Sequence, residues 1–196
     1  MMDRIAELEV IAGLKRGDEA AFDRIFGEYR PRIFSFILRL IGRKDVAEDL
    51  TQELWLRLTA RAWTLREDTR LGPWLFTVAR NLCVSFWRSR GEFEPAINVD
   101  IELLEMPGSN PRTLPRATEA EELRQRIERA LAALPVRYRE VLMLIGVEGI
   151  SPADAAVVCG IKPEALRKRL ERARKMFAEK LGMERGAQSA GKRGKQ

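Results

Sequence analysis

The stretch SPADAAVVCGIKPEALRKRLERAR, residues 151–174, decides the fold of the C-terminal part of the chain. Ser151, followed by a proline and then by the acidic Asp154, is typical of a helix start, because a serine side chain accepts from free backbone N–H groups and proline suits a first turn. Gly160 ends this short helix, and Pro163 begins a longer one. A short helix, a glycine turn and a longer helix together predict a helix-turn-helix.

The second helix of this pair is strongly basic. Between residues 162 and 180, eight side chains are basic and three are acidic. Arginine can bind guanine through two hydrogen bonds in the major groove of DNA, and lysine or arginine can contact phosphate. The alternative is an ordinary solvated basic face. The position of the helix directly after a capped short helix and a glycine turn favours DNA binding.

Helical periodicity extends through most of the remaining chain. Apolar residues recur at offsets of three and four within residues 21–29, 31–41, 46–60, 74–88 and 119–134. Pro31 predicts the start of a new helix, Gly42 a helix end and Asp45 a helix cap. No stretch alternates convincingly with period two. The expected fold class is therefore all-α, with two small helical domains joined by a Pro-containing linker, the C-terminal one a helix-turn-helix.

Composition divides the chain into segments. Residues 91–118 contain four prolines and carry two basic against five acidic side chains, which is typical of a stiff and soluble linker. We expect one domain over residues 1–90 and a second over residues 119–181. Residues 182–196 are rich in glycine and in basic side chains, and they are predicted to form a disordered tail.

The overall composition restricts the classes of function. The chain has 196 residues and a formal net charge of +6, which favours a polyanionic partner such as nucleic acid. It contains no histidine and only two cysteines, which excludes histidine-based triads and zinc cages. No apolar run reaches the ~20 residues that span a bilayer. We therefore expect a binding protein rather than an enzyme, with no cofactor, no metal, no small-molecule substrate and no membrane insertion.

Acidic residues gather on the helix expected over residues 46–60. Asp45, Glu48, Asp49 and Glu53 lie at offsets of three, four and eight, so they are close together on a helix. Because like charges repel, a basic partner surface would stabilise them. Alternatively, the carboxylates only favour the helix N-terminus. A metal-dependent nucleic-acid enzyme is a third interpretation, but the chain has no accompanying nucleotide-binding loop.

Residues 61–90 interleave aromatic and basic side chains. A protein that captures an unstacked base needs aromatic faces and a polar group that reads the base edge. Trp74 and Phe76 suit either this role or the apolar core, and we favour the core for Trp74. Asn81 is a polar residue in an apolar helix pattern, and asparagine is a poor helix former, which suggests a functional role.

Four segments together resemble sigma-70 family factors of the extracytoplasmic-function (ECF) type. Residues 45–57 (DVAEDLTQELWLR) are similar to the family's polymerase-binding helix, and residues 74–81 (WLFTVARN) to its promoter −10 helix. The sequence from Leu134 to Leu142 looks like the beginning of the family's C-terminal domain, and residues 160–174 resemble its recognition segment. The segments follow the order of the family, with a linker between them.

The resemblance implies a bacterial sigma factor that binds core RNA polymerase, recognises the −35 and −10 promoter elements and helps to melt DNA. Core-polymerase binding, against the clamp coiled coil of the largest subunit, would fall to Asp45, Glu48, Asp49, Gln52, Glu53 and Leu56. The −10 contacts would come from Trp63, Arg66, Arg70, Arg80, Asn81, Trp87 and Arg88. The −35 contacts would come from Lys162, Glu164, Ala165, Arg167, Lys168, Arg169 and Arg172.

The resemblance also implies a cytoplasmic protein whose partners are core RNA polymerase, promoter DNA and an anti-sigma factor. It places the acidic linker in the RNA path of polymerase, whereas composition alone requires only an extended soluble segment. Lys168 departs from the family, which commonly has a small serine there, and Asp154 stands alone where the family often has a glutamate-bearing pair. The alternative function is a helix-turn-helix DNA-binding regulator acting without RNA polymerase. Such a regulator would need a dimerisation or effector domain.

Overall fold

The structure is a computed structural model that describes residues 4–91 and 119–193, with side chains described for residues 4–91 and 120–182. The helices of the described part are α1 (Arg4–Arg16), α2 (Glu19–Ile41), α3 (Lys44–Arg61), α4 (Leu71–Ser89), α5 (Glu119–Ala132), α6 (Val136–Leu142), α7 (Pro152–Cys159) and α8 (Pro163–Arg193). A 3-10 turn η1 (Ala62–Thr64) and a π-helical turn η3 (Met143–Val147) complete them. These residues contain no strand, so the all-α prediction is confirmed. The predicted linker lies outside the described residues, apart from Gly91.

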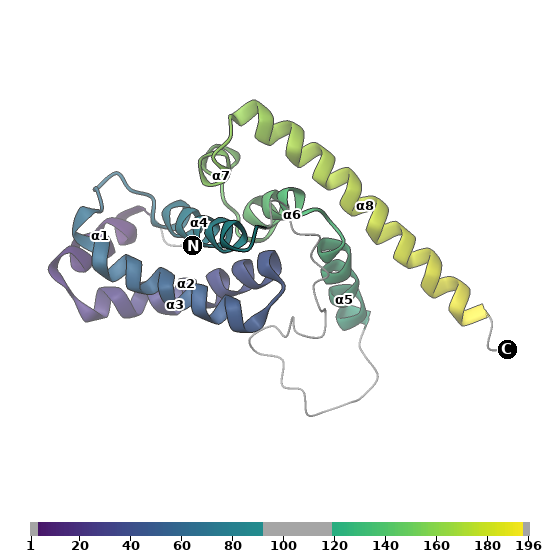
Figure 1. Cartoon of the computed structure of the whole chain (residues 1–196), viewed down its shortest axis with the longest axis horizontal. Coiled ribbons are helices and arrows are strands. Elements are labelled where there is room, and N and C mark those ends of the chain that lie inside the picture. Colours follow the sequence, from purple (N-terminus) through teal and green to yellow (C-terminus); the bar gives the residue numbers. More distant parts are fainter. Residues whose placement is uncertain (1–3, 92–118, 194–196) are drawn as a thin grey trace, which may run out of the picture.

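Helices α1 to α4 form the N-terminal module, residues 4–91 (Figure 1). Its core is built along α2, whose apolar stripe is almost completely buried and consists of Ile25, Tyr29, Ile33, Phe36 and Leu40. Helices α1, α3 and α4 all contact α2 or one another around this stripe. Burial of apolar side chains on one stripe of each helix is what stabilises such a bundle.

The predicted helix break at Pro31 is wrong, because α2 continues through that residue to Ile41. Proline removes one backbone hydrogen bond and crowds the carbonyl four residues earlier, which is that of Gly27. Both Gly27 and Pro31 are exposed, so water can satisfy that carbonyl. The buried stripe on the opposite side of the helix continues unbroken and outweighs the local cost. The predicted helix end at Gly42 is confirmed, since Gly42 has a left-handed φ of 73° and donates to the Leu38 carbonyl.

The predicted cap at Asp45 is also wrong. Helix α3 begins at Lys44, with Arg43 as its N-terminal flanking residue and no side-chain cap. The Asp45 carboxylate lies in the first turn and accepts from Arg43 Nη2 at 2.6 Å. Hydrogen bonds from Arg43 and from the backbone of Val46 hold the pKa of Asp45 below its usual value. A negative charge at this position still complements the helix N-terminus.

The C-terminal module, residues 119–193, contains the predicted helix-turn-helix. Ser151 Oγ accepts from the Asp154 backbone N–H at 3.2 Å, which caps α7 as the sequence predicts. Gly160 has a φ of 63°, and the Ile161 N–H donates to the Ala156 carbonyl at 3.0 Å, which is a Schellman helix end. Helix α8 then begins at Pro163.

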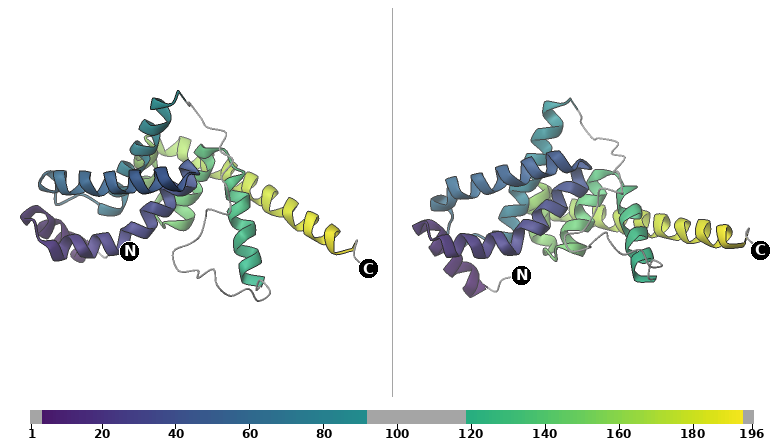
Figure 2. Two further views of the ribbon diagram at one scale, coloured as in Figure 1. Left: turned by 60° about the horizontal axis from the view of Figure 1, so that its bottom comes forward. Right: turned by 90° about the horizontal axis from the view of Figure 1, so that it is seen from below.

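Helix α8 is the longest helix of the module and contacts α5, α6 and α7 along its length. Its C-terminal turns extend away from the N-terminal module in every view (Figures 1 and 2). The helix continues to Arg193, through most of the segment where the sequence predicts a disordered tail. None of the described helices has the length and apolar content needed to cross a membrane.

The two modules pack against each other, mainly through α4 and α7 (Figure 1). Arg32 Nε donates to Glu148 Oε2 at 2.8 Å, and Arg39 forms a buried bidentate pair with Glu128 at 2.6 and 2.9 Å. Because each pair joins a helix of one module to a residue of the other, separation of the modules would break all of these contacts.

Arg139 links the ends of two helices that belong to different modules. The residue is 1% exposed, and its guanidinium donates to the carbonyls of Leu131, Ala132 and Leu134 at and just beyond the end of α5. It also donates to the Arg39 carbonyl near the end of α2 at 2.6 Å. Burial lowers the pKa of the Arg139 guanidinium to about 10, so the side chain stays charged at neutral pH. A cation at helix C-termini satisfies carbonyls that have no partner within the helix.

Candidate polymerase- and DNA-binding surfaces

The six residues predicted to bind polymerase lie on the outer side of α3. Five are exposed and Glu53 is half-buried, whereas the inner side of α3 buries Val46, Ala47, Leu54 and Leu58. Leu56 is 58% exposed, which places an apolar side chain among the carboxylates. The structure therefore brings the predicted residues together on one accessible helix face.

The charges of this face are only partly compensated. Asp45 pairs with Arg43, and Glu53 Oε1 accepts from Arg57 Nε at 2.7 Å. Among the described residues, Glu48 and Asp49 form no ion pair, and they remain exposed at the centre of the face. The described residues contain no group of three or more His, Cys, Asp or Glu side chains that could hold a metal ion. The face suits a basic protein partner.

The predicted −10 residues do not form one compact site. Trp63 lies in η1, Arg66 and Arg70 in the loop of residues 65–70, and the remaining four residues on α4. Arg70 and Arg88 stand at opposite ends of α4, about 27 Å apart by the rise of an α-helix. Trp63 is 74% exposed and its indole N–H donates to the Ala60 carbonyl at 3.1 Å, so the ring presents its faces to solvent. Such a ring can stack on an unpaired base.

Trp74, Phe76 and Trp87 differ in burial. Phe76 is completely buried and packs edge-on against Phe36 with ring centroids 5.2 Å apart. Trp74 is half-buried against the core, as predicted. Trp87 is also half-buried and packs against the core, so only part of its ring is available to DNA.

Asn81 and its neighbour Arg80 point in different directions. Asn81 is exposed on α4, so its amide needs no buried hydrogen-bond partner. An exposed polar residue is ordinary on a helix, so its position in an apolar pattern no longer argues for a functional role. Arg80 is half-buried and donates from Nε to Glu140 Oε1 of α6 at 2.5 Å. Asn81 and the exposed Arg88 are seven residues apart, which places both on the same face of α4.

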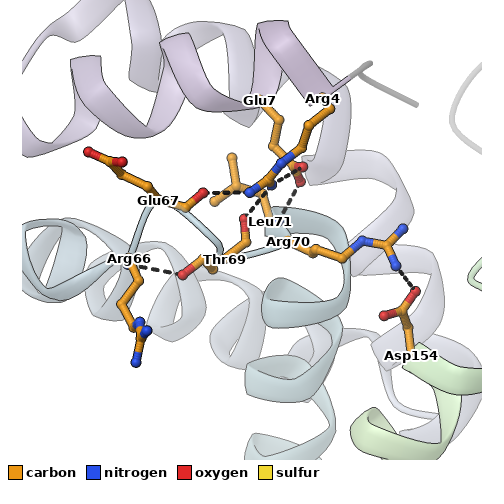
Figure 3. Close-up of polar contacts among 8 residues, drawn as sticks. All are labelled: Arg4, Glu7, Arg66, Glu67, Thr69, Arg70, Leu71 and Asp154. Atoms are coloured by element: carbon orange, nitrogen blue, oxygen red, sulfur yellow. Dashed lines mark hydrogen bonds and ion pairs between the residues drawn. The ribbon is translucent and has the colours of Figure 1, made fainter.

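Two arginines predicted for the −10 element are thus paired with the C-terminal module. Besides Arg80 with Glu140, Arg70 Nη1 donates to Asp154 Oδ2 in the first turn of α7 (Figure 3). Both pairs join a helix or loop of the N-terminal module to the helix-turn-helix domain. In this arrangement Arg70 and Arg80 are engaged with carboxylates, and DNA phosphate would have to replace those carboxylates.

The predicted −35 residues cluster at the beginning of α8. Lys162 precedes the helix, and Glu164, Ala165, Arg167, Lys168 and Arg172 are exposed on it. Leu166 and Ala173 on the inner side are buried and fix the orientation of the helix. Arg169 is half-buried, and its Nη1 lies 3.9 Å from Glu140 Oε2. The structure therefore presents a basic helix end, with Arg169 partly turned toward the module interface.

Glu140 stands at the centre of the module interface. Burial raises the pKa of its carboxyl group, and the nearby Arg80 and Arg169 oppose that effect. The Cys159 thiol of α7 hydrogen-bonds with Glu140, and both Cys83 of α4 and Cys159 are buried. Burial raises the pKa of both thiols, and for Cys159 it does so to about 12. Neither thiol is therefore a reactive nucleophile in this arrangement.

Sequence reasoning did not identify Arg4, Glu7, Arg39, Glu128 or Arg139. Each of these residues acts on a segment far away in the chain, for example Arg39 on Glu128 and Arg4 on the loop of residues 65–70. In the sequence they are ordinary charged positions of amphipathic helices. No local pattern distinguishes them, because their partners become neighbours only after folding.

Comparison with known proteins agrees with this architecture. The family "Sigma-70 region 2" matches residues 25–93, and "Sigma-70, region 4" matches residues 124–177. The chain is 35% identical over 167 residues to the ECF RNA polymerase sigma factor EcfG of Rhodopseudomonas palustris strain TIE-1, covering 82% of this chain and 84% of that protein. It is 26% identical over 189 residues to the ECF RNA polymerase sigma-E factor of Escherichia coli K12, covering 92% and 97%.

A solved structure is also similar. The sigma factor RpoE of Bartonella quintana, determined in complex with the anti-sigma factor NepR, is 28% identical and superposes with a TM-score of 0.64, covering 82% of this chain and 96% of that one. The first matched region covers most of α2 together with α3 and α4, the second covers most of the C-terminal module, and the two occur in the predicted order. The chain belongs to the sigma-70 family of RNA polymerase sigma factors, in its ECF group.

Proposed function

We propose that this sigma factor uses three separate surfaces: the outer face of α3 for core RNA polymerase, Trp63 and the loop of residues 65–70 with α4 for the −10 element, and the beginning of α8 for the −35 element. As a member of its family it is a transcription-initiation factor and not an enzyme. The observation that carries the proposal is that none of the residues proposed for α3 and α8 is buried, whereas the opposite side of each helix packs into the core. Both helices therefore present these residues to partners.

DNA melting in this proposal is driven by binding energy. Separating one base step costs a few kcal/mol, and stacking of a base on an aromatic ring returns ~1–3 kcal/mol. The exposed ring of Trp63 and the exposed Asn81 and Arg88 supply stacking and polar contacts. Nucleotide addition belongs to the polymerase.

Binding of the promoter requires Arg70 and Arg80 of the N-terminal module to separate from their carboxylate partners in the C-terminal module. Arg70 and Arg80 contact Asp154 and Glu140 in the compact arrangement, so phosphate must compete with two carboxylates of the same chain. Ion pairs of this kind are exchanged at modest cost where solvent reaches them, and Arg70 is more exposed than Arg80. We therefore expect Arg70 to be released before Arg80.

We further propose cytoplasmic action under the control of an anti-sigma partner. The support is the similarity to the RpoE sigma factor that was determined in complex with NepR. The path of the linker through polymerase remains a prediction, because the linker residues lie outside the described part of the chain.

Run-off transcription with purified core polymerase over a library of promoters tests the proposal as a whole. We expect transcripts only when this chain is added, and only from promoters that share a −35 and a −10 sequence. A chain that binds duplex DNA but directs no transcription would support the alternative of a regulator that acts without polymerase.

Replacing Arg172 with alanine is expected to weaken binding to the −35 element. Arg172 is exposed on α8, and loss of a two-bond contact to a base costs ~1–3 kcal/mol. Fluorescence anisotropy with a labelled −35 duplex at fixed salt measures the change. Lys180→Ala, at an exposed basic position further along α8, is the control and should have a smaller effect. If Arg172→Ala and the unaltered chain bind the duplex with equal affinity, Arg172 does not contact a base of the −35 element.

Replacing Asn81 with alanine is expected to impair promoter opening more than initial binding. Its exposed amide on α4 is proposed to read a base that becomes accessible only after melting. Permanganate footprinting of unpaired thymines should show a weaker bubble, while a gel-shift assay on closed complexes changes little. A parallel decrease in both assays would contradict a role specific to the open strand.

A further inference from the structure

The loop of residues 65–70 leads into a helix that lacks a cap of its own. The residue before α4 is Arg70, which makes no side-chain cap hydrogen bond. Pro73 in the first turn has no N–H, so the N–H groups of Leu71 and Gly72 are the unpaired donors closest to the start of the helix. A helix that begins inside a protein needs a partner for such donors.

Glu7 of α1 supplies that partner from a distant part of the chain. Its Oε1 accepts from the Leu71 N–H at 2.5 Å, across 64 positions of sequence (Figure 3). The Glu7 side chain is largely buried, with 12% of its surface exposed. A carboxylate at this position also complements the positive end of α4. Glu7 therefore does what an N-cap residue does, but from another helix.

Arg4, one turn earlier on α1, holds the loop itself. Its Nη1 donates to the Thr69 carbonyl at 2.9 Å and its Nη2 to the Glu67 carbonyl at 2.5 Å (Figure 3). The same guanidinium pairs with Glu7 Oε2 at 2.9 Å. The planar fork of arginine suits two acceptors at a fixed separation, which lysine could not satisfy in the same way. The Arg4–Glu7 pair thus binds two loop carbonyls and the first N–H of α4 as one unit.

The remaining contacts fix the two ends of the loop, and at its exposed tip Arg66 Nε lies 3.1 Å from Asp68 Oδ1. Leu65 and Leu71 at its two ends are buried. Inside the loop, the Thr69 N–H donates to the Arg66 carbonyl and the Arg66 N–H donates to Thr69 Oγ1, both at 3.0 Å. The side chains of Arg66, Glu67 and Asp68 are exposed. The loop is therefore a braced turn whose exposed tip is presented to solvent in a fixed orientation.

We propose that Arg4 and Glu7 are positioning residues for −10 recognition: they set the conformation of the loop of residues 65–70, which is proposed above to contact the −10 element. The proposal rests on the proposed function of that loop. Helix α1 lies outside residues 25–93, which match the family, so the brace is not part of the matched region. Val10, Ile11 and Leu14 anchor α1 in the core and hold the pair in place.

Three variants and a control test the brace on the full-length chain. Arg4→Met removes the donors of the fork, and Glu7→Ala removes the acceptor for Leu71. Glu7→Gln keeps an oxygen that can accept from the Leu71 N–H but replaces Oε2, the acceptor for Arg4, by an NH2 group, so its effect on the Leu71 N–H should be smaller than that of Glu7→Ala. Arg16→Met, an exposed position at the other end of α1, is the matched control for Arg4→Met.

Two measurements test separately whether Arg4 and Glu7 hold the loop and whether this affects −10 recognition. Amide hydrogen exchange of Leu71 in the free protein should become roughly 5- to 10-fold faster in Arg4→Met and Glu7→Ala, as expected when a helix loses its cap, and should stay unchanged in Arg16→Met. Transcription with core polymerase on promoters that differ at single −10 positions should show a loss of base preference at one position. Affinity for core polymerase should stay the same.

Each outcome bears on a different part of the proposal. Unchanged Leu71 exchange in Arg4→Met and Glu7→Ala would overturn the brace. Faster exchange with an equal loss of transcription on every promoter would overturn the positioning role, because a merely structural defect does not change base preference. If the unaltered chain directs no transcription at all, the proposed function is overturned together with the role of the loop, whereas the exchange data still report on the contact.

Discussion

Replacing Arg139 with methionine is expected to lower the free energy of unfolding by about 3–5 kcal/mol, because four carbonyls lose a charged donor in a buried site. Methionine fills much of the same volume, so the loss comes from the hydrogen bonds and not from a cavity. Three of the carbonyls lie at or just beyond the end of α5 and one near the end of α2. The variant should therefore weaken the contact between the modules as well as the C-terminal module.

Chemical denaturation followed by two probes measures this effect. All four tryptophans lie in the N-terminal module, so their fluorescence reports that module, whereas circular dichroism reports the helices of both. We expect the circular-dichroism transition of Arg139→Met to move to lower denaturant concentration than the fluorescence transition. Arg137→Met, at an exposed position on the same helix, should cost less than about 1 kcal/mol. A similar small cost for Arg139→Met would contradict the assigned role.

Replacing Asp49 with lysine is expected to weaken the affinity for core polymerase by at least about tenfold, because a like charge would face the basic surface of the partner. Asp49 is exposed and unpaired at the centre of the α3 face among the described residues. The variant should fold normally, since the side chain makes no buried contact.

Binding of labelled protein to core polymerase, measured at two salt concentrations, tests this expectation. Glu122→Lys on α5 changes the charge by the same amount at another exposed helix position and should bind as the unaltered chain does. Equal weakening by both variants would indicate a general effect of net charge. Normal co-purification of Asp49→Lys with polymerase would refute the assignment of α3.

The helix-turn-helix could be predicted because its signals are local. Ser151 caps α7 with its side chain, and Gly160 ends the helix in a left-handed conformation that few other residues adopt. Each signal depends only on residues close by in the sequence. The helix break predicted at Pro31 is wrong because that prediction also used only a local signal. The local preference of proline is to begin a helix, but the stripe from Ile25 to Leu40 is buried as one surface and keeps α2 continuous. Tertiary packing therefore outweighs the local preference of Pro31.

The binding residues were partly predictable from the sequence. The face of α3 follows from helical spacing alone, and the structure places its six residues on one side. The environment of Arg80 does not follow from spacing, because its partner Glu140 is 60 positions away. The brace made by Arg4 and Glu7 is likewise invisible in the sequence. Contacts of this kind depend on which helices become neighbours, and periodicity carries no information about that.

The two cysteines lie where their reactivity would report separation of the two modules. Cys83 on α4 and Cys159 on α7 are both buried beside Glu140, where the helices of the two modules meet. While the modules remain together, each sulfur stays protonated and shielded from solvent. We expect that parting of α4 from α7, as promoter or partner engagement would demand, increases the exposure of these cysteines to solvent. The natural chain could then be followed by alkylation kinetics, with no label introduced.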